Sequence, residues 1–163
     1  MESNWKRAKP IESENMLPIL EKELRIRFPA SYLECVMKNN GAYSVKDGIF
    51  SEELTAVLDV SNLLRIDRGS YNIYEIYQVL KDRMPPKTVP FAEDSFGNKY
   101  CFVFEENSEP KVVFWNHDVR DGDISELASS FDDFLDKLLT VEEADELERR
   151  LEEEEERERR NRR

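Results

Sequence analysis

The sequence predicts an α+β fold in which helices pack on a β-sheet, plus a charged C-terminal helix. One observation is a strand, turn, strand, turn, strand pattern over residues 88–117. Its middle run, Lys99 to Glu105, is apolar on both faces, which is typical of a strand inside a sheet. The other observation is that apolar residues recur at helical spacing before and after this unit.

The two turns of the 88–117 unit carry residues suited to chain reversal. Gly97 and Asn98 tolerate the positive φ angles of a tight turn. Pro110 has no backbone N–H and cannot continue a hydrogen-bond ladder. We therefore expect a hairpin between the first two strands and a second break before the third.

The N-terminal part predicts an arm followed by two helices. Residues 1–12 are polar and without periodicity, so we expect a flexible arm, and the pattern leaves open whether Trp5 packs on the domain. Leucines at helical spacing over residues 17–24 predict the first helix. Pro29 is well placed to open a second helix, which stops near Asn40.

Between these helices and the sheet unit we expect one strand and one helix. Alternation of apolar and other residues predicts a strand within the run from Leu54 to Val60. Asn72, with Glu75 three residues later, is a capping-box pattern at the start of a helix whose apolar face extends to Met84. Two prolines then end this helix.

Two capping patterns mark the C-terminal part. Ser130, with Asp133 in the first turn, predicts a helix whose apolar stripe extends to Leu139. Thr140 with Glu143 is another capping box, so the tail that follows is either a new helix or a continuation of the previous one. Within this tail, glutamates precede arginines by four residues, an arrangement that stabilises a solvated helix.

Length and charge limit the class of protein. At 163 residues the chain suits one globular domain, expected over residues 13–140, between the arm and a Glu/Arg-rich helical tail over residues 141–163. The formal net charge of −12 repels nucleic acid and anionic membranes and attracts basic partners. The sequence has neither a secretory signal nor a membrane-spanning run, so we expect a cytoplasmic protein. We expect it to be a monomer or a weak dimer.

Residues that carry chemistry in enzymes are sparse. His117 is the only histidine, and Cys35 and Cys101 lie in apolar runs, so we expect no metal site and no catalytic nucleophile. Nucleophile elbows and phosphate-binding glycine loops are absent from the sequence. Adjacent acids such as Glu93 and Asp94 arise by number alone among 36 acidic residues. The sequence therefore predicts a binding protein that is not an enzyme and uses no cofactor.

An ordered series of residues runs from Met16 to Leu139. It consists of Leu20-Glu21, Leu24, Phe28-Pro29, Tyr32-Leu33, Asn40-Gly41, Val89-Pro90-Phe91-Ala92, Asp94, Gly97-Asn98, Tyr100, Phe102, Val112, Trp115, His117-Asp118, Ser130-Phe131 and Phe134-Leu135. This series resembles the SUKH superfamily, which includes the yeast cell-wall-synthesis regulator of the Smi/Knr type and many bacterial immunity domains.

The resemblance implies an α+β fold, a twisted mixed or antiparallel sheet with helices packed mainly on one face, and a non-enzymatic role. Bacterial members are typically encoded beside secreted polymorphic toxins, often nucleases, which contact-dependent and related systems deliver, and they protect the producing cell by binding the toxin. The implied function is an immunity protein that covers the active site of a cognate basic toxin with an acidic surface. The alternative is an intracellular regulatory scaffold of the yeast type, and a hydrolase that uses acidic residues is a further rival.

The candidate partner-binding residues are acids and aromatics in loops beside the sheet. They are Glu93, Asp94, Phe96, Trp115, His117, Asp118 and Asp121. For the two aromatic residues the alternative is packing in the core, and for Asp94 it is hydrogen bonding within the turn.

Overall fold

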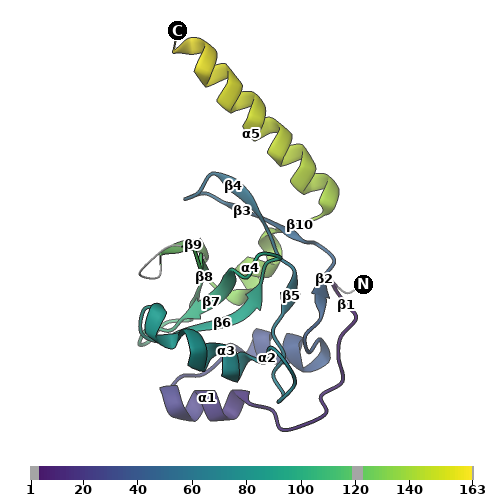
Figure 1. Ribbon diagram of the computed structural model, residues 1–163, viewed down its shortest axis with the longest axis vertical. Helices are drawn as coiled ribbons and strands as arrows, with labels where there is room; N and C mark the ends of the chain where they lie inside the picture. The colour runs from purple at the N-terminus through teal and green to yellow at the C-terminus, as the bar shows by residue number, and fades with distance from the viewer. Residues whose placement is uncertain (1–3, 119–122, 163) are drawn as a thin grey trace.

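The fold is built on an antiparallel sheet rich in aromatic residues. A computed structural model describes residues 4–118 and 123–162 (Figure 1). Within these residues, seven strands form one sheet in the order β1-β2-β5-β6-β7-β8-β9, and three strands form a second sheet in the order β10-β3-β4. Every described strand pair is antiparallel. The predicted α+β class is confirmed.

The elements have the following bounds. The larger sheet contains β1 (Trp5–Lys6), β2 (Tyr43–Ser44), β5 (Asn62–Leu63), β6 (Thr88–Glu93), β7 (Lys99–Val103), β8 (Lys111–Trp115) and β9 (Ile124–Ala128). The smaller sheet contains β3 (Gly48–Ser51), β4 (Ala56–Asp59) and β10 (Leu138–Leu139). The helices are α1 (Leu17–Leu24), α2 (Ala30–Lys38), α3 (Ile73–Leu80), the short 3-10 helix η1 (Lys81–Arg83), α4 (Phe131–Lys137) and α5 (Val141–Asn161).

The predicted three-strand unit is present as β6, β7 and β8. Strand β7 lies between the other two and is buried on both faces, as its apolar pattern predicts. The β6–β7 turn contains Gly97 at φ 91°, a conformation that glycine adopts without steric cost. This unit holds the larger sheet together and positions the turns at its ends.

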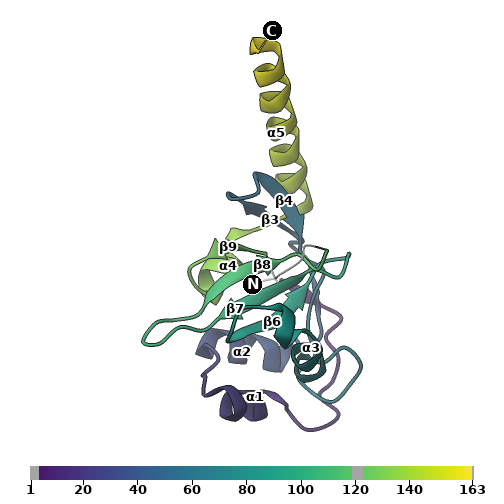
Figure 2. The ribbon, with the colours of Figure 1, turned by 60° about the vertical axis from the view of Figure 1, so that its left-hand side comes forward.

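One face of the sheet carries an aromatic core under the helices. Phe91 of β6 stacks on Phe102 of β7, with ring centroids 4.3 Å apart. Tyr32 of α2 meets Phe102 edge-on at 5.1 Å, and Phe131 of α4 meets Tyr32 at 5.5 Å. Each such pair adds about 0.5–1.5 kcal/mol to the free energy gained from burial. This core joins α2 and α4 to the centre of the sheet, while Figure 2 shows α1 beside α2.

The opposite face has a smaller apolar cluster. Cys101, Val113 and Trp115 are buried there beneath Met84. The apolar pattern predicts a helix that extends to Met84, but α3 ends at Leu80. The chain then passes through η1, and Met84 follows it just before the two prolines. Helices therefore cover mainly one face of the sheet, as expected.

From residue 4 onward, the N-terminal segment packs on the domain, whereas a flexible arm was expected over residues 1–12. Trp5 is buried, and β1 pairs with β2 through Ser44. Further along, the backbone N–H of Glu12 donates to the carboxylate of Asp67 at 3.0 Å. The physical reason is that Trp5 has a large apolar surface to bury, which outweighs the polar composition around it.

The sequence predicts that Leu138 and Leu139 belong to the helix that follows Ser130, and this prediction is wrong. These two residues form β10, and Leu138 pairs with Ile49 of β3. Helix α4 ends at Lys137, so α5 is a separate helix, and the open question of a continuation is settled. Thr140 and Glu143 form the capping box at the start of α5. The predicted Leu54–Val60 strand is confirmed as the shorter β4.

Helix α5 stands away from the body of the molecule (Figures 1 and 2). Ala144 is its only described buried residue, and it lies against Gly48 of β3. Beyond the first turns the helix is stabilised by ion pairs four residues apart, such as Arg159 with Glu155. Among the described residues, none of the helices is both long and apolar enough to cross a bilayer.

Candidate protein-binding surface

The β6–β7 turn is organised around the carboxylate of Asp94. Its Oδ1 accepts hydrogen bonds from the backbone N–H groups of Phe96 and Asn98, at 2.9 and 2.8 Å, and its Oδ2 accepts one from the Asn98 side chain at 2.8 Å. Asp94 is only 7% exposed. An aspartate that bonds backbone groups two and four residues ahead fixes the shape of a turn. Asp94 therefore holds the turn and offers little surface to a partner.

Glu93 is also engaged within the protein. Its carboxylate lies 3.1 Å from the Lys99 ammonium, which in turn donates to the carbonyl of Gly97 at 2.9 Å. Both side chains of this pair are mostly buried. The pair links the end of β6 to the start of β7 and leaves the Glu93 charge neutralised.

Trp115 belongs to the second apolar cluster. Its side chain is fully buried, and the guanidinium of Arg83 lies over its ring at 5.1 Å from the centroid. The same guanidinium donates to the carbonyl of His117 at 2.8 Å. In this structure the indole supports the sheet and has no exposed surface for a partner.

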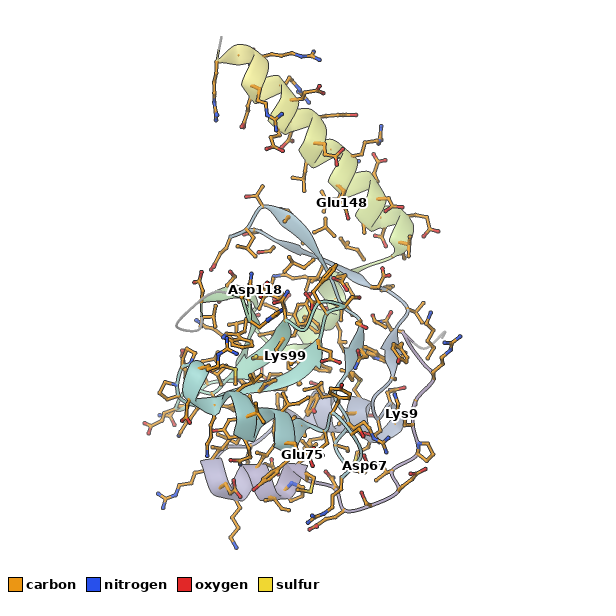
Figure 3. The ribbon with its side chains drawn as sticks, viewed as in Figure 1. Lys9, Asp67, Glu75, Lys99, Asp118 and Glu148 are labelled. Carbon is orange, nitrogen blue, oxygen red and sulfur yellow. The ribbon has the colours of Figure 1, made fainter. Side chains whose placement is uncertain are left out.

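The remaining described candidates are exposed and lie together. Phe96 is 75% exposed, and its carbonyl lies 2.8 Å from Nε2 of His117. The backbone N–H of His117 donates to the Asn98 side chain at 3.1 Å, which joins the segment after β8 to the β6–β7 turn. Asp118 has an 80% exposed side chain beside the imidazole of His117. Figure 3 shows Asp118 above Lys99, on the side of the β3–β4 hairpin. We call Phe96, His117 and Asp118 the turn face; Asp121 lies outside the described residues.

Neither cysteine has an environment that would favour its thiolate form. Burial raises the pKa of the Cys101 thiol far above its ordinary value, and burial also raises the pKa of Cys35. A buried thiol that stays protonated is a poor nucleophile. Within the described residues, no three His, Cys, Asp or Glu side chains come together as metal ligands.

A second acidic region was not identified from the sequence. A groove of about 410 Å³ lies between the tip of the β3–β4 hairpin, strand β9 and helix α4. Its lining residues are Phe50, Glu52, Glu53, Glu126, Leu127, Ala128, Ser129, Asp133 and Lys137. We call this the acidic groove. In the sequence, only the adjacent acids Glu52 and Glu53 hint at the acidic groove. The sequence does not show that β9 lies opposite them.

The comparison with protein families gives one match. The model of the SMI1/KNR4 family (SUKH-1) matches residues 12–137, which is most of the chain. The chain belongs to the SUKH-1 family. A comparison with curated proteins and with solved structures finds no match.

The SUKH match covers both candidate binding regions. The match includes both the turn face and the whole lining of the acidic groove, which ends with Lys137. It leaves out β10 and α5. SUKH proteins include both toxin-immunity proteins and relatives of the Smi/Knr regulators, and they are generally non-catalytic. The family therefore indicates a protein that acts through protein–protein contacts.

Proposed function

We propose that this chain is an immunity protein that binds a cognate secreted bacterial toxin domain and neutralises it by covering its active site. The observation that carries the proposal is a SUKH domain within a chain whose formal net charge is −12. The proposal places this encounter in the cytoplasm of the producing cell. It assigns the chain no catalysis and no cofactor.

The mechanism follows from electrostatics. A toxin that cleaves nucleic acid must hold phosphates, so its active cleft is basic. An acidic protein is steered toward such a cleft by long-range attraction and competes with the substrate for the same cations. Charge sets the rate and the orientation of the encounter, whereas a few buried contacts supply most of the affinity.

The turn face offers such contacts. Phe96 presents an aromatic ring that is three quarters exposed, and the exposed Asp118 carboxylate comes from the neighbouring segment. An apolar anchor beside a charge is a common composition for the centre of an interface. Both residues lie on turns whose backbone is fixed by the bonds of Asp94 and Asn98. The rigid support lowers the entropy that binding would otherwise cost.

A regulatory scaffold is the second candidate function. It is favoured by α5, whose outer turns are exposed and which projects beyond the domain as a second interaction element (Figure 1). A scaffold would use this helix to hold a second protein. An immunity protein needs only the domain.

An inhibition assay tests the proposal. The toxin domain encoded beside this chain is titrated with the purified protein, and its activity is followed. We expect activity to fall in proportion to added protein and to vanish at one molecule per toxin, because occlusion is stoichiometric. The double variant Phe96→Ser/Asp118→Asn should weaken inhibition at unchanged thermal stability. Full toxin activity in a molar excess of folded protein contradicts the immunity function and favours the scaffold.

A further inference from the structure

The acidic groove is formed by the β3–β4 hairpin tip and by two elements, β9 and α4, that follow one another much later in the chain. The hairpin tip, residues 52–55, follows β3 and places two glutamates on one wall. Strand β9 contributes the opposite wall with Glu126, and α4 contributes Asp133 from its first turn and Lys137 from its last. Strand β3 contacts β9, so the walls are held near each other.

The groove has more negative charge than the protein neutralises. Four carboxylates and one ammonium line it, for a net charge of −3. Lys137 is already engaged, because it lies 3.2 Å from Asp133 and donates to the carbonyl of Leu127 at 2.9 Å. Among the described residues, the carboxylates of Glu52 and Glu53 have no cation and no hydrogen-bond donor as a partner.

The remaining acid, Glu126, is only weakly held. It lies 3.7 Å from Lys111, and both side chains are about half exposed, at 51% and 46%. An exposed ion pair of this kind contributes about 0–1 kcal/mol and exchanges readily with another cation. Three of the four carboxylates are therefore available to an incoming positive charge.

The floor of the groove is apolar and ends at a free sheet edge. Phe50 is half-buried there, and Leu127 and Ala128 are buried beside it. A cation placed over an aromatic face gains about 0.5–2 kcal/mol, and a guanidinium can stack on the ring while it bonds carboxylates. Strand β9 pairs on one side only within the described residues, with β8. An extended segment can therefore lie along this edge.

We propose that the acidic groove binds an arginine-bearing segment of the protein partner, with a guanidinium inserted between Glu52, Glu53 and Glu126 over Phe50. The proposal rests on the proposed function, since it names the chemistry of the partner's contact. The acidic groove differs from the turn face in its position and in the kind of side chain that it selects. The partner is a protein and not a second copy of this chain, because two copies that each carry a charge of −12 repel one another.

The test uses a charge-matched pair of variants of the full chain. Glu52→Gln/Glu53→Gln removes two charges from the groove. Glu34→Gln/Glu75→Gln removes two charges from exposed residues of α2 and α3, and Figure 1 shows these helices at the opposite end of the body from the β3–β4 hairpin. Both variants carry the same net charge, so they differ only in where charge is lost. The probes are an eight-residue peptide of alternating arginine and valine, the same peptide with lysine, and the neighbouring toxin domain.

We expect Glu52→Gln/Glu53→Gln to weaken binding of the arginine peptide and of the toxin domain about tenfold, which corresponds to ~1.4 kcal/mol. The Glu34→Gln/Glu75→Gln control should change either affinity less than about twofold, as expected for remote charges. The lysine peptide should bind more weakly than the arginine peptide, because it stacks less well on Phe50.

The outcomes separate this inference from the proposed function. If the toxin domain binds the groove variant and the wild type equally, the groove proposal is overturned and the immunity function stands. If the arginine peptide binds the groove but the toxin domain binds nowhere, the immunity function fails and the groove stands. Equal weakening by both variants would show general charge attraction and overturn the groove. Self-association in sedimentation that the groove variant abolishes would assign the groove to a second copy and also overturn it.

Discussion

The β6–β7 turn and the β3–β4 hairpin tip both present acidic residues, but they use them in opposite ways. At the turn, Asp94 accepts three hydrogen bonds and is almost wholly buried. At the hairpin tip, the exposed carboxylates of Glu52 and Glu53 have no described partner. Bonded carboxylates hold the fold, whereas free carboxylates remain available for binding. The number of acids in a region therefore says less about binding than their hydrogen bonds do.

The largest loss of stability is expected at Asp67, a hydrogen-bonded acid that lies outside both regions. Its side chain is fully buried, and Arg65 donates to both of its oxygens at 2.8 Å. These bonds hold the pKa of Asp67 far below its ordinary value. Asp67→Asn should reduce the free energy of unfolding at pH 7 by about 3–5 kcal/mol, because it breaks a buried ion pair. Urea denaturation at neutral pH measures the change.

The pH dependence of stability provides the control for Asp67. A carboxyl whose pKa is lowered by folding stabilises the protein above its unfolded pKa, about 3.9, and this stabilisation is lost as the pH falls toward the folded pKa. The wild type should therefore lose stability below about pH 4 more steeply than Asp67→Asn. If the free energy of unfolding falls equally steeply with pH in the two proteins, the Asp67 carboxylate does not act through its charge.

A smaller loss is expected at the turn itself. Asp94→Ala removes the acceptor of three hydrogen bonds and should lower the free energy of unfolding by about 2–3 kcal/mol, since bonds to charged groups contribute more than neutral ones. Thermal unfolding of the wild type and of Asp94→Ala measures this loss of stability. A loss below about 0.5 kcal/mol, the usual effect of a surface substitution, would mean that the turn does not depend on Asp94.

The smallest effect on stability is expected at the hairpin tip. Glu52→Gln/Glu53→Gln should change the free energy of unfolding by less than about 0.5 kcal/mol, because neither carboxylate has a described partner to lose. The same thermal scans that measure Asp94→Ala provide this value. A clear destabilisation would show that these glutamates support the hairpin, and the contrast between the two regions would disappear.

Local sequence patterns predict much of this fold. The 88–117 unit, the caps at Asn72 and Ser130 and the capping box at Thr140 all have the structure that their residues indicate. These features depend on neighbours within a few positions in the chain, and the side chains that form them are visible in the sequence.

Long-range contacts account for what the sequence does not predict. Leu138 suits a helix stripe as well as a strand, and only its pairing with Ile49 decides between them. Trp5 is buried because β2 is available as a partner. The acidic groove depends on β9 lying opposite a hairpin tip that is more than seventy residues away in the chain. Of the predicted partner-binding residues, Phe96, His117 and Asp118 lie together on the surface, and their role in binding stays a prediction. The sequence does not show that Asp94 and Trp115 are used within the fold.

The most direct test of the central claim is titration calorimetry between this protein and the toxin domain encoded beside it, at low and at high salt. We predict a one-to-one complex whose affinity falls as salt rises, because an acidic surface meets a basic one. Absence of binding at both salt concentrations, with both proteins folded, would rule out the immunity function. It would leave the regulatory scaffold as the function that the SUKH domain supports.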